Sequence, residues 1–184
     1  MPILNSIGLI ELTSIAGGYQ AGDAMLKAAD VRMLLSRSIC SGKYMVMVGG
    51  DVAAVRASVE AGKLSARAMV VDFFTIPNVH PDIFPAIAGV NQVEMLEALG
   101  IIESFSVASL IEAADAAVKT ARVKLIELRL AMALGGKAFV TLTGEVAAVR
   151  SAVDAGAAVC AERGLLVNKV VIPNPRRELL KEFV

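Results

Sequence analysis

The stretch VAAVRASVEAG at residues 52–62 recurs as VAAVRSAVDAG at residues 146–156. The similarity extends toward the amino terminus of each copy, where residues 7–41 match residues 99–133 at 12 of 35 positions. The tripeptide Ile-Pro-Asn follows in both copies. Self-similarity over this length indicates a duplicated structural unit. The sequence therefore predicts two similar domains in tandem.

The joint between the two copies lies near residues 86–97, between Pro85 and the second Gly-Ile-Ile-Glu. We therefore place the first domain at residues 1–92 and the second at residues 93–184. A chain of 184 residues is long enough for two small domains of this size.

Each copy has the same order of predicted elements. GLIEL at residues 8–12 is short, apolar and bounded by glycine, which is typical of a strand. An alanine-rich helix is predicted at residues 19–30, where Asp23 and Lys27 are spaced to form an ion pair. Asp51 is a candidate cap of the second helix, and Gly62 is interpreted as its end or a bend. The predicted strands are residues 8–12, 32–39, 43–49 and 69–77, then 100–104, 124–132, 137–144 and 165–173.

The resulting order within each copy is β-α-β-β-α-β, which is that of a ferredoxin-like domain. The second copy repeats the first helix at residues 111–122, with Asp115 and Lys119 at the same spacing. We therefore predict an α+β fold made of two ferredoxin-like domains.

The composition excludes several classes of protein. Apolar residues make up 56% of the chain and the mean hydropathy is +0.66, yet no run of about 18 apolar residues is present to cross a membrane. The apolar surplus instead predicts interfaces between subunits. The 18 basic and 18 acidic side chains balance, which argues against a nucleic-acid-binding protein.

The sequence lacks the motifs of secreted proteins and those of common enzyme classes. Two cysteines do not make a disulfide framework, and the first residues have neither the basic nor the apolar region of a signal peptide. We therefore expect a cytoplasmic protein. No nucleophile–base pair, dinucleotide fingerprint or P-loop lysine is evident, so we do not expect an enzyme.

Four other candidate residues have structural interpretations. Cys160 lies in an apolar helix and is interpreted as a small buried hydrophobic side chain. His80, the single histidine, has no neighbouring catalytic partner and is expected at the surface. Glu11 and Glu103 occupy equivalent strand ends, and their duplication favours a structural role over acid–base chemistry.

The motifs in their order carry more information than any one of them. G-(L/I)-I-E-x-x-S-x-A is followed by A-x-D-A-x-x-K-x-A-x-V, G-K, G-(D/E)-V-A-A-V and I-P-N, and the whole series occurs twice. This series resembles the shell proteins of bacterial microcompartments in their tandem-domain form, most closely the PduT-like members. The resemblance covers about residues 6–180.

The resemblance implies a function in a protein shell. Tandem members form trimers whose six domains imitate a hexamer, and these discs tile with other shell proteins around encapsulated enzymes. The loop between the second and third strands of each domain lines a pore on the central axis. The residues of these two loops are Ser38, Ile39, Cys40, Ser41 and Gly42 in the first domain and Met132, Ala133, Leu134 and Gly135 in the second.

Cys40 is the residue that distinguishes the two loops, because its counterpart is Met132. From the residues alone, a single cysteine in a turn is most often inert. The resemblance implies instead a [4Fe–4S] cluster at the threefold axis, shared by three chains with Cys40 as the one ligand from each. Such a cluster would transfer electrons across the shell, with a redox enzyme inside the shell or in the cytosol as a partner. Ser41 stands where such proteins usually have proline.

The resemblance also implies contacts at the edge between neighbouring discs. Both Lys27 and Lys119 match the family's edge lysine. Asn78 and Asn174 occupy the position where the family often has an arginine. The expected edge residues are Lys27, Lys119, Asp30, Arg122, Asn78, Asn174 and Arg176.

Two alternatives to the cluster-bearing shell subunit remain open from the sequence. One is a shell subunit whose open central pore passes small metabolites. The other is an oligomeric regulatory protein outside any shell that binds a ligand between its domains, because ferredoxin-like repeats also build such modules.

Overall fold

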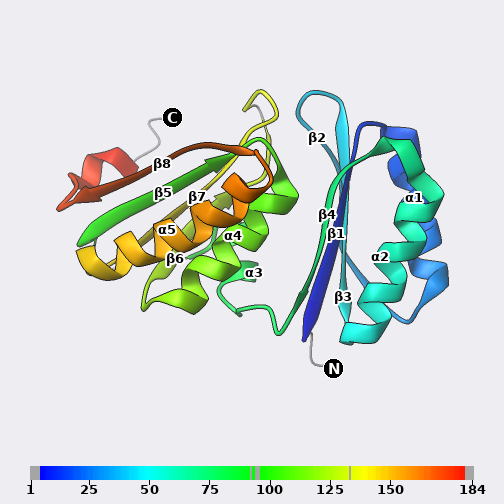
Figure 1. The fold of residues 1–184 in the computed structure, drawn as a ribbon, viewed down its shortest axis with the longest axis horizontal. Helices are drawn as coiled ribbons and strands as arrows, with labels where there is room; N and C mark the ends of the chain where they lie inside the picture. The colour runs from blue at the N-terminus through cyan, green and yellow to red at the C-terminus, as the bar shows by residue number, and fades with distance from the viewer. Residues whose placement is uncertain (1–4, 92, 94–95, 133, 181–184) are drawn as a thin grey trace.

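The computed structural model describes residues 5–91, 93, 96–132 and 134–180. Two units of similar architecture follow one another along the chain (Figure 1). The first consists of β1 (Ser6–Leu12), α1 (Ile15–Ala28), β2 (Arg32–Ile39), β3 (Lys43–Gly50), α2 (Val52–Ala66), the 3₁₀ turn η1 (Arg67–Met69) and β4 (Val70–Pro77). After α3 (Ile83–Ala88), the second consists of β5 (Ala98–Ser104), α4 (Val107–Thr120), β6 (Lys124–Arg129), β7 (Ala138–Gly144), α5 (Val146–Glu162), β8 (Leu166–Pro173) and η2 (Arg177–Leu180).

Each unit contains a four-stranded antiparallel sheet. The strand order is β4-β1-β3-β2 in the first unit and β8-β5-β7-β6 in the second. This is the ferredoxin-like arrangement, so the predicted α+β fold is confirmed. Gly8 and Gly100 occupy equivalent places where a helix crosses the sheet, and a Cβ atom on either would lie within 2.8 Å of a valine side chain.

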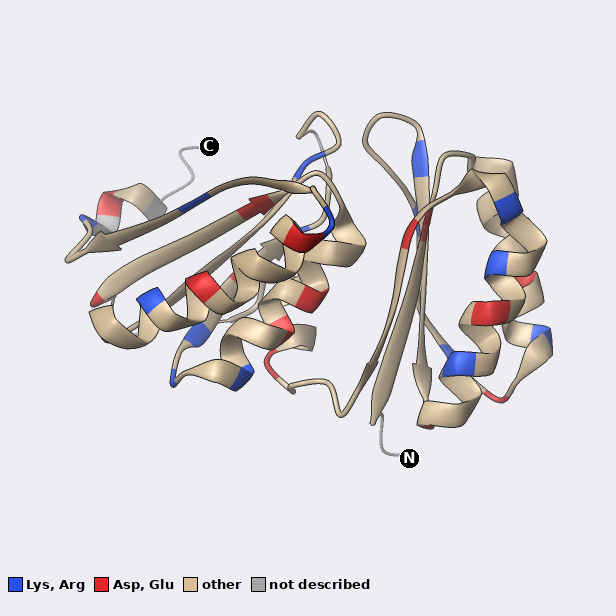
Figure 2. Ribbon diagram, in the orientation of Figure 1, with Lys and Arg blue, Asp and Glu red and all other residues tan. Residues whose placement is uncertain are grey.

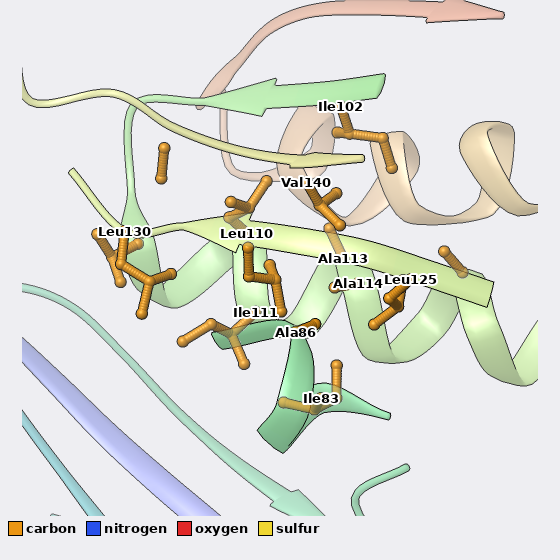
Figure 3. Close-up of a cluster of buried hydrophobic side chains, with 14 of the residues drawn as sticks. Ile83, Ala86, Ile102, Leu110, Ile111, Ala113, Ala114, Leu125, Leu130 and Val140 are labelled. Atoms are coloured by element: carbon orange, nitrogen blue, oxygen red, sulfur yellow. The ribbon is translucent and has the colours of Figure 1, made fainter. Parts of the chain in front are cut away.

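One hydrophobic cluster spans both units, and a second lies within the first unit between its sheet and helices α1 and α2. In Figure 1, α1 and α2 cover one face of the first sheet, and α4 and α5 cover one face of the second. Helix α4 also packs against β1 and β4, on the other face of the first sheet. Figure 3 shows Leu110 and Ile111 of α4 beside Ile83 and Ala86 of α3, and all four side chains are fully buried. The first sheet is therefore covered on both faces, by its own helices and by the second unit.

Several predicted boundaries differ from the structure, among them the end of one strand and the start of the first helix in each unit. The strand predicted at residues 124–132 ends at Arg129, because Ala131 adopts a left-handed conformation with φ of 50°. Helix α1 begins at Ile15, where the Ser14 hydroxyl accepts a hydrogen bond from the Gly17 amide at 3.1 Å. An N-cap of this kind starts a helix ahead of the alanine-rich segment.

The interpretation of Gly62 as a helix end is wrong, since α2 continues to Ala66. The residue is a glycine because a Cβ atom there would lie 2.5 Å from Cδ1 of Ile10 and 2.7 Å from Cγ of Met25. The prediction that Asp51 caps α2 is confirmed, because its carboxylate accepts from the Ala53 amide at 2.9 Å.

Charged residues of both signs are interspersed along the outer helices α2 and α5 (Figure 2). Within the described part of the chain, no helix combines the length and the apolar character needed to cross a membrane.

Candidate functional site

The loops that follow β2 and β6 meet at one end of the molecule. Figure 1 shows the turn between β2 and β3 beside the connection between β6 and β7. The backbone N–H of Cys40 donates to the carbonyl oxygen of Ala131 at 2.7 Å. A Cβ atom on Gly136 would lie 3.3 Å from the Ser41 hydroxyl oxygen. The two copies of the predicted pore loop are therefore held side by side within one chain.

The first loop is a tight turn. Ser41 and Gly42 have positive φ angles of 23° and 77°, and both are exposed. Cys40 is partly exposed at the start of the turn. Ser38 and Ile39 are the last residues of β2 and lie outside the turn, with Ile39 buried in the core.

The second loop is longer by two residues and carries no thiol. Met132 is exposed, Leu134 is half-buried, and Gly135 and Gly136 have positive φ angles of 61° and 86°. Ala133, which we also expected in this loop, lies outside the described residues. The two loops therefore offer one thiol per chain at this end of the molecule.

The described residues of one chain do not assemble a metal site from three or more His, Cys, Asp or Glu side chains. Within residues 5–91, 93, 96–132 and 134–180, no three His, Cys, Asp or Glu residues lie close enough together to hold a metal ion. Cys160 is buried in α5, where its thiol donates to the carbonyl oxygen of Ser109 at 3.6 Å. Burial raises the pKa of the Cys160 thiol, so the thiol stays protonated at neutral pH. Cys40 is accordingly the candidate ligand.

The predicted edge lysines both form ion pairs within their own helices. Lys27 pairs with Asp23 at 2.6 Å and is well exposed, whereas Lys119 pairs with Asp115 and is more covered. Asp30, Arg122, Asn78, Asn174 and Arg176 are all exposed. Whether any of these residues contacts a neighbouring disc stays a prediction.

Asn78 and Asn174 show how closely the two units repeat. Each directly follows the last strand of its unit and has a positive φ angle, 51° and 46° respectively.

His80, expected at the surface, is half-buried in the turn after β4. Its backbone N–H donates to the Asp115 carboxylate at 2.8 Å, and its Nδ1 accepts from the Asp82 amide at 3.3 Å. His80 therefore joins the two units.

Sequence reasoning missed the polar network between the two units. Glu11 is fully buried, forms an ion pair with Lys43, and accepts hydrogen bonds from the Ser106 hydroxyl at 3.0 Å and the Val107 amide at 2.9 Å. The amide belongs to the amino end of α4, where the helix dipole favours a carboxylate. Both the Glu and the helix-capping Ser recur in each copy, but their recurrence does not indicate that Glu11 of one unit contacts the helix of the other.

A second carboxylate extends this network. Asp72 of β4 accepts a hydrogen bond from the Ser109 hydroxyl at 2.6 Å and pairs with Arg163 at 3.0 Å. Arg163 also pairs with Glu112 of α4. Burial of the carboxyl raises the pKa of Glu112, although the Arg163 guanidinium opposes this effect. The contact between units thus combines apolar packing with paired charges, of which Glu11 is fully buried.

The BMC domain family matches the chain twice, at residues 6–79 and 98–175. These two ranges coincide with the two ferredoxin-like units and make up most of the chain. The chain belongs to the BMC domain family. It is a tandem member, with two BMC domains in contact through one hydrophobic cluster.

Two full-length relatives support this assignment. The bacterial microcompartment shell protein PduT of Citrobacter freundii is 45% identical over 179 residues, which are 97% of this chain and 97% of that protein. The crystal structure of a microcompartment protein from Desulfitobacterium hafniense superposes with a TM-score of 0.85 at 56% identity, covering 95% of this chain and 97% of that one.

A single-domain relative matches about half of the chain. The microcompartment shell protein EutM of Salmonella typhimurium is 46% identical over 88 residues, or 48% of this chain and 90% of that protein. The protein is thus a PduT-like tandem BMC protein of the microcompartment shell. Membership of a family of shell proteins decides against the alternative of a regulatory protein outside any shell.

Proposed function

We propose that this shell subunit forms a trimer and that three copies of Cys40 hold a [4Fe–4S] cluster on its threefold axis, through which electrons cross the shell. The proposal extends to its partners, which are other shell proteins and a redox enzyme on one side of the shell.

The position of the two loops is the observation that carries this proposal. The Cys40 turn and the loop around Ala131 lie side by side at one end of the chain, joined by a backbone hydrogen bond. An axis that passes beside one loop therefore passes beside both. Three chains around such an axis would bring six loops and three thiols to it.

The chemistry of the donor set suits iron better than a hard cation. Thiolate sulfur is a soft ligand that favours iron–sulfur clusters, and three cysteines can ligate three irons of a [4Fe–4S] cube. Cys40 is partly exposed in a turn, so its side chain can reach outside its own chain. When bound, the cluster would accept and donate single electrons.

The chain's own residues fix the backbone that carries the Cys40 thiol. The hydrogen bond from the Cys40 amide to Ala131 fixes the backbone at the ligand. The buried Ile39 anchors the end of β2 next to it. Ser41 and Met132 are exposed beside the thiol, so their side chains would set the access of water to the axis.

Removal of one thiol at a time tests this proposal. Cys40→Ser should keep the fold and the assembly, because serine has a similar volume at a partly exposed position. It should abolish the iron and sulfide bound after anaerobic reconstitution, together with the visible absorption and the paramagnetic signal of the reduced cluster. Cys160→Ser is the matched control and should retain all three.

The proposed cluster is wrong if wild-type protein binds no more iron and sulfide than Cys40→Ser. In that outcome the same loops line an open pore through which small metabolites pass.

A further inference from the structure

The proposed cluster requires one ligand that Cys40 does not supply. A [4Fe–4S] cluster has four irons, and one Cys40 from each of three chains would ligate three of them. The three thiolates would be related by the threefold axis, so the fourth iron would lie on the axis itself. Its ligand must therefore come from the loops beside Cys40. Sulfur and imidazole nitrogen are the protein donors that suit iron in such clusters.

Two of the donors that suit iron lie away from the loops. His80, the single histidine of the sequence, follows β4, whose last residue pairs with Ser6 at the start of β1. The Cys40 turn precedes β3, whose amino-terminal end pairs with Leu12 at the end of β1. His80 and Cys40 therefore lie at opposite ends of the first sheet. Cys160 is fully buried in α5.

The lysines that directly follow the two loops hold carboxylates in ion pairs. Lys43 pairs with the fully buried Glu11, and Lys137 pairs with Glu103 at 2.6 Å. Carboxylate oxygen is also a hard ligand, which suits Mg²⁺ or Ca²⁺ better than an iron–sulfur cluster. These two carboxylates are therefore poor ligands for the fourth iron.

Met132 is the other sulfur donor among the described residues of the two loops. Its side chain is 55% exposed, whereas the other described methionines are buried or half-buried. It directly follows Ala131, whose carbonyl oxygen accepts the hydrogen bond from the Cys40 amide at 2.7 Å. In the repeat, Met132 is the counterpart of Cys40. Both copies of the loop thus present a sulfur at the same position.

The backbone that carries Met132 is held beside the Cys40 turn. Ala131 has a φ of 50°, a left-handed conformation that a residue with a Cβ atom keeps only where its surroundings hold it. The hydrogen bond from Cys40 is one such contact. The methionine side chain is unbranched and has three rotatable bonds, so its sulfur can adjust to a ligand without movement of this backbone.

We propose that the thioether sulfur of Met132 ligates the fourth iron of the cluster that three copies of Cys40 hold. This inference rests on the proposed function and completes its ligand set with three thiolates and one thioether. Three chains would offer three copies of Met132, of which one is sufficient. The thioether takes the place of a water molecule and carries no charge, so its binding transfers no electron and releases no proton.

Met132→Leu removes the sulfur and keeps an apolar side chain of similar size. Wild type and variant are reconstituted anaerobically and then oxidised with ferricyanide. Ferricyanide takes one electron from the cluster, Fe²⁺ leaves from the fourth position, and the remaining [3Fe–4S] cluster is measured by electron paramagnetic resonance. The variant should lose this iron about tenfold faster, because loss of a group that only supports a metal ligand already weakens metal affinity about 10–100-fold.

Two further variants control the comparison. Met33→Leu makes the same exchange in β2, at the end of the strand away from Cys40, and should lose iron at the wild-type rate. Met132→Cys replaces one sulfur ligand by another and should retain the fourth iron at least as long as wild type. A role of Met132 as an apolar cover would be kept by leucine and lost with cysteine, which is the opposite result.

Cyanide gives a second readout that does not depend on oxidation. It binds iron that has a position open to exchange. Cyanide should therefore change the paramagnetic signal of the reduced cluster in Met132→Leu, and it should leave the signal of wild type and of Met33→Leu unchanged.

The outcomes separate this ligand from the cluster itself. If wild-type protein holds no cluster after reconstitution, the proposed function fails and the ligand assignment fails with it. If wild type and Met132→Leu both hold the cluster, lose the fourth iron at the same rate and respond alike to cyanide, Met132 is not the ligand although the cluster stands.

Discussion

Gly62 determines how closely α2 approaches the first sheet. A Cβ atom at this position would lie 2.5 Å from Cδ1 of Ile10 and 2.7 Å from Cγ of Met25, both fully buried. Gly156 has the same place in the second unit, where a Cβ atom would lie 2.6 Å from the carbonyl oxygen of Ala113. The glycine is therefore required by packing and not by a turn.

Gly62→Ala should lower the free energy of unfolding by about 1–3 kcal/mol, which is typical of overpacking a well-filled core. The measurement is urea unfolding followed by circular dichroism. Gly22→Ala is the matched control in α1, because its Cβ would lie no closer than 3.6 Å to Met33 and the equivalent residue is Ala114. The control should raise the free energy of unfolding by about 0.5–1 kcal/mol. Equal effects of the two substitutions would contradict this explanation.

For single residues, the sequence predicted interactions with neighbours along the chain better than contacts with distant residues. It indicated the cap at Asp51 and the helical ion pairs of Lys27 and Lys119, because these depend on spacing along the chain. It assigned Glu11 only a structural role and did not indicate its contact with α4. That contact joins residues 95 apart in sequence, and no local pattern encodes it.

Helix α4 carries a carboxyl whose pKa is shifted by its surroundings. Glu112 of α4 pairs with Arg163 and lies near two other acidic residues, Asp72 and Asp115. Burial raises the pKa of the Glu112 carboxyl from its ordinary value of 4.5. At pH values between 4.5 and the raised pKa, the folded protein binds more protons at Glu112 than the unfolded chain does. The free energy of unfolding contributed by Glu112 therefore falls as the pH rises through this window.

Glu112→Gln removes this titration. The free energy of unfolding of the variant, relative to wild type, should therefore increase as the pH rises from about 4 to about 7. Urea unfolding at several pH values measures the difference. Glu60→Gln, whose carboxylate is largely exposed on α2, controls for the general effect of replacing a carboxylate by an amide. A relative stability of Glu112→Gln that falls with rising pH would contradict the assigned sign.

The order of strands and helices within each unit was predictable because each of them has a local signal, whereas α3, between the two units, was not predicted. The end of β6 was not, since Leu130 and Ala131 are as apolar as the strand before them but belong to the loop that contacts Cys40. Tertiary contact between the two loops determines that boundary, and hydrophobic pattern alone extends the strand past it.

For the whole molecule, the duplication predicted two like domains but not how they contact each other. The apolar surplus indicated interfaces without placing them. The structure assigns one interface within the chain, between α4 and the first sheet. Tyr19 and Ile111 occupy equivalent positions in the two units, yet Tyr19 is 67% exposed whereas Ile111 is fully buried in the contact between units.

The most direct test of the threefold site is chemical cross-linking of Cys40 in the Cys160→Ser variant with a short reagent that carries three maleimide groups. If three Cys40 thiols meet at one axis, cluster-free protein should yield a covalent product of three times the 19.2 kDa chain on a denaturing gel. The Cys40→Ser, Cys160→Ser double variant should yield none. A reaction that stops at single chains or at pairs, in protein whose native mass is that of three chains, would contradict the placement of Cys40 on the axis.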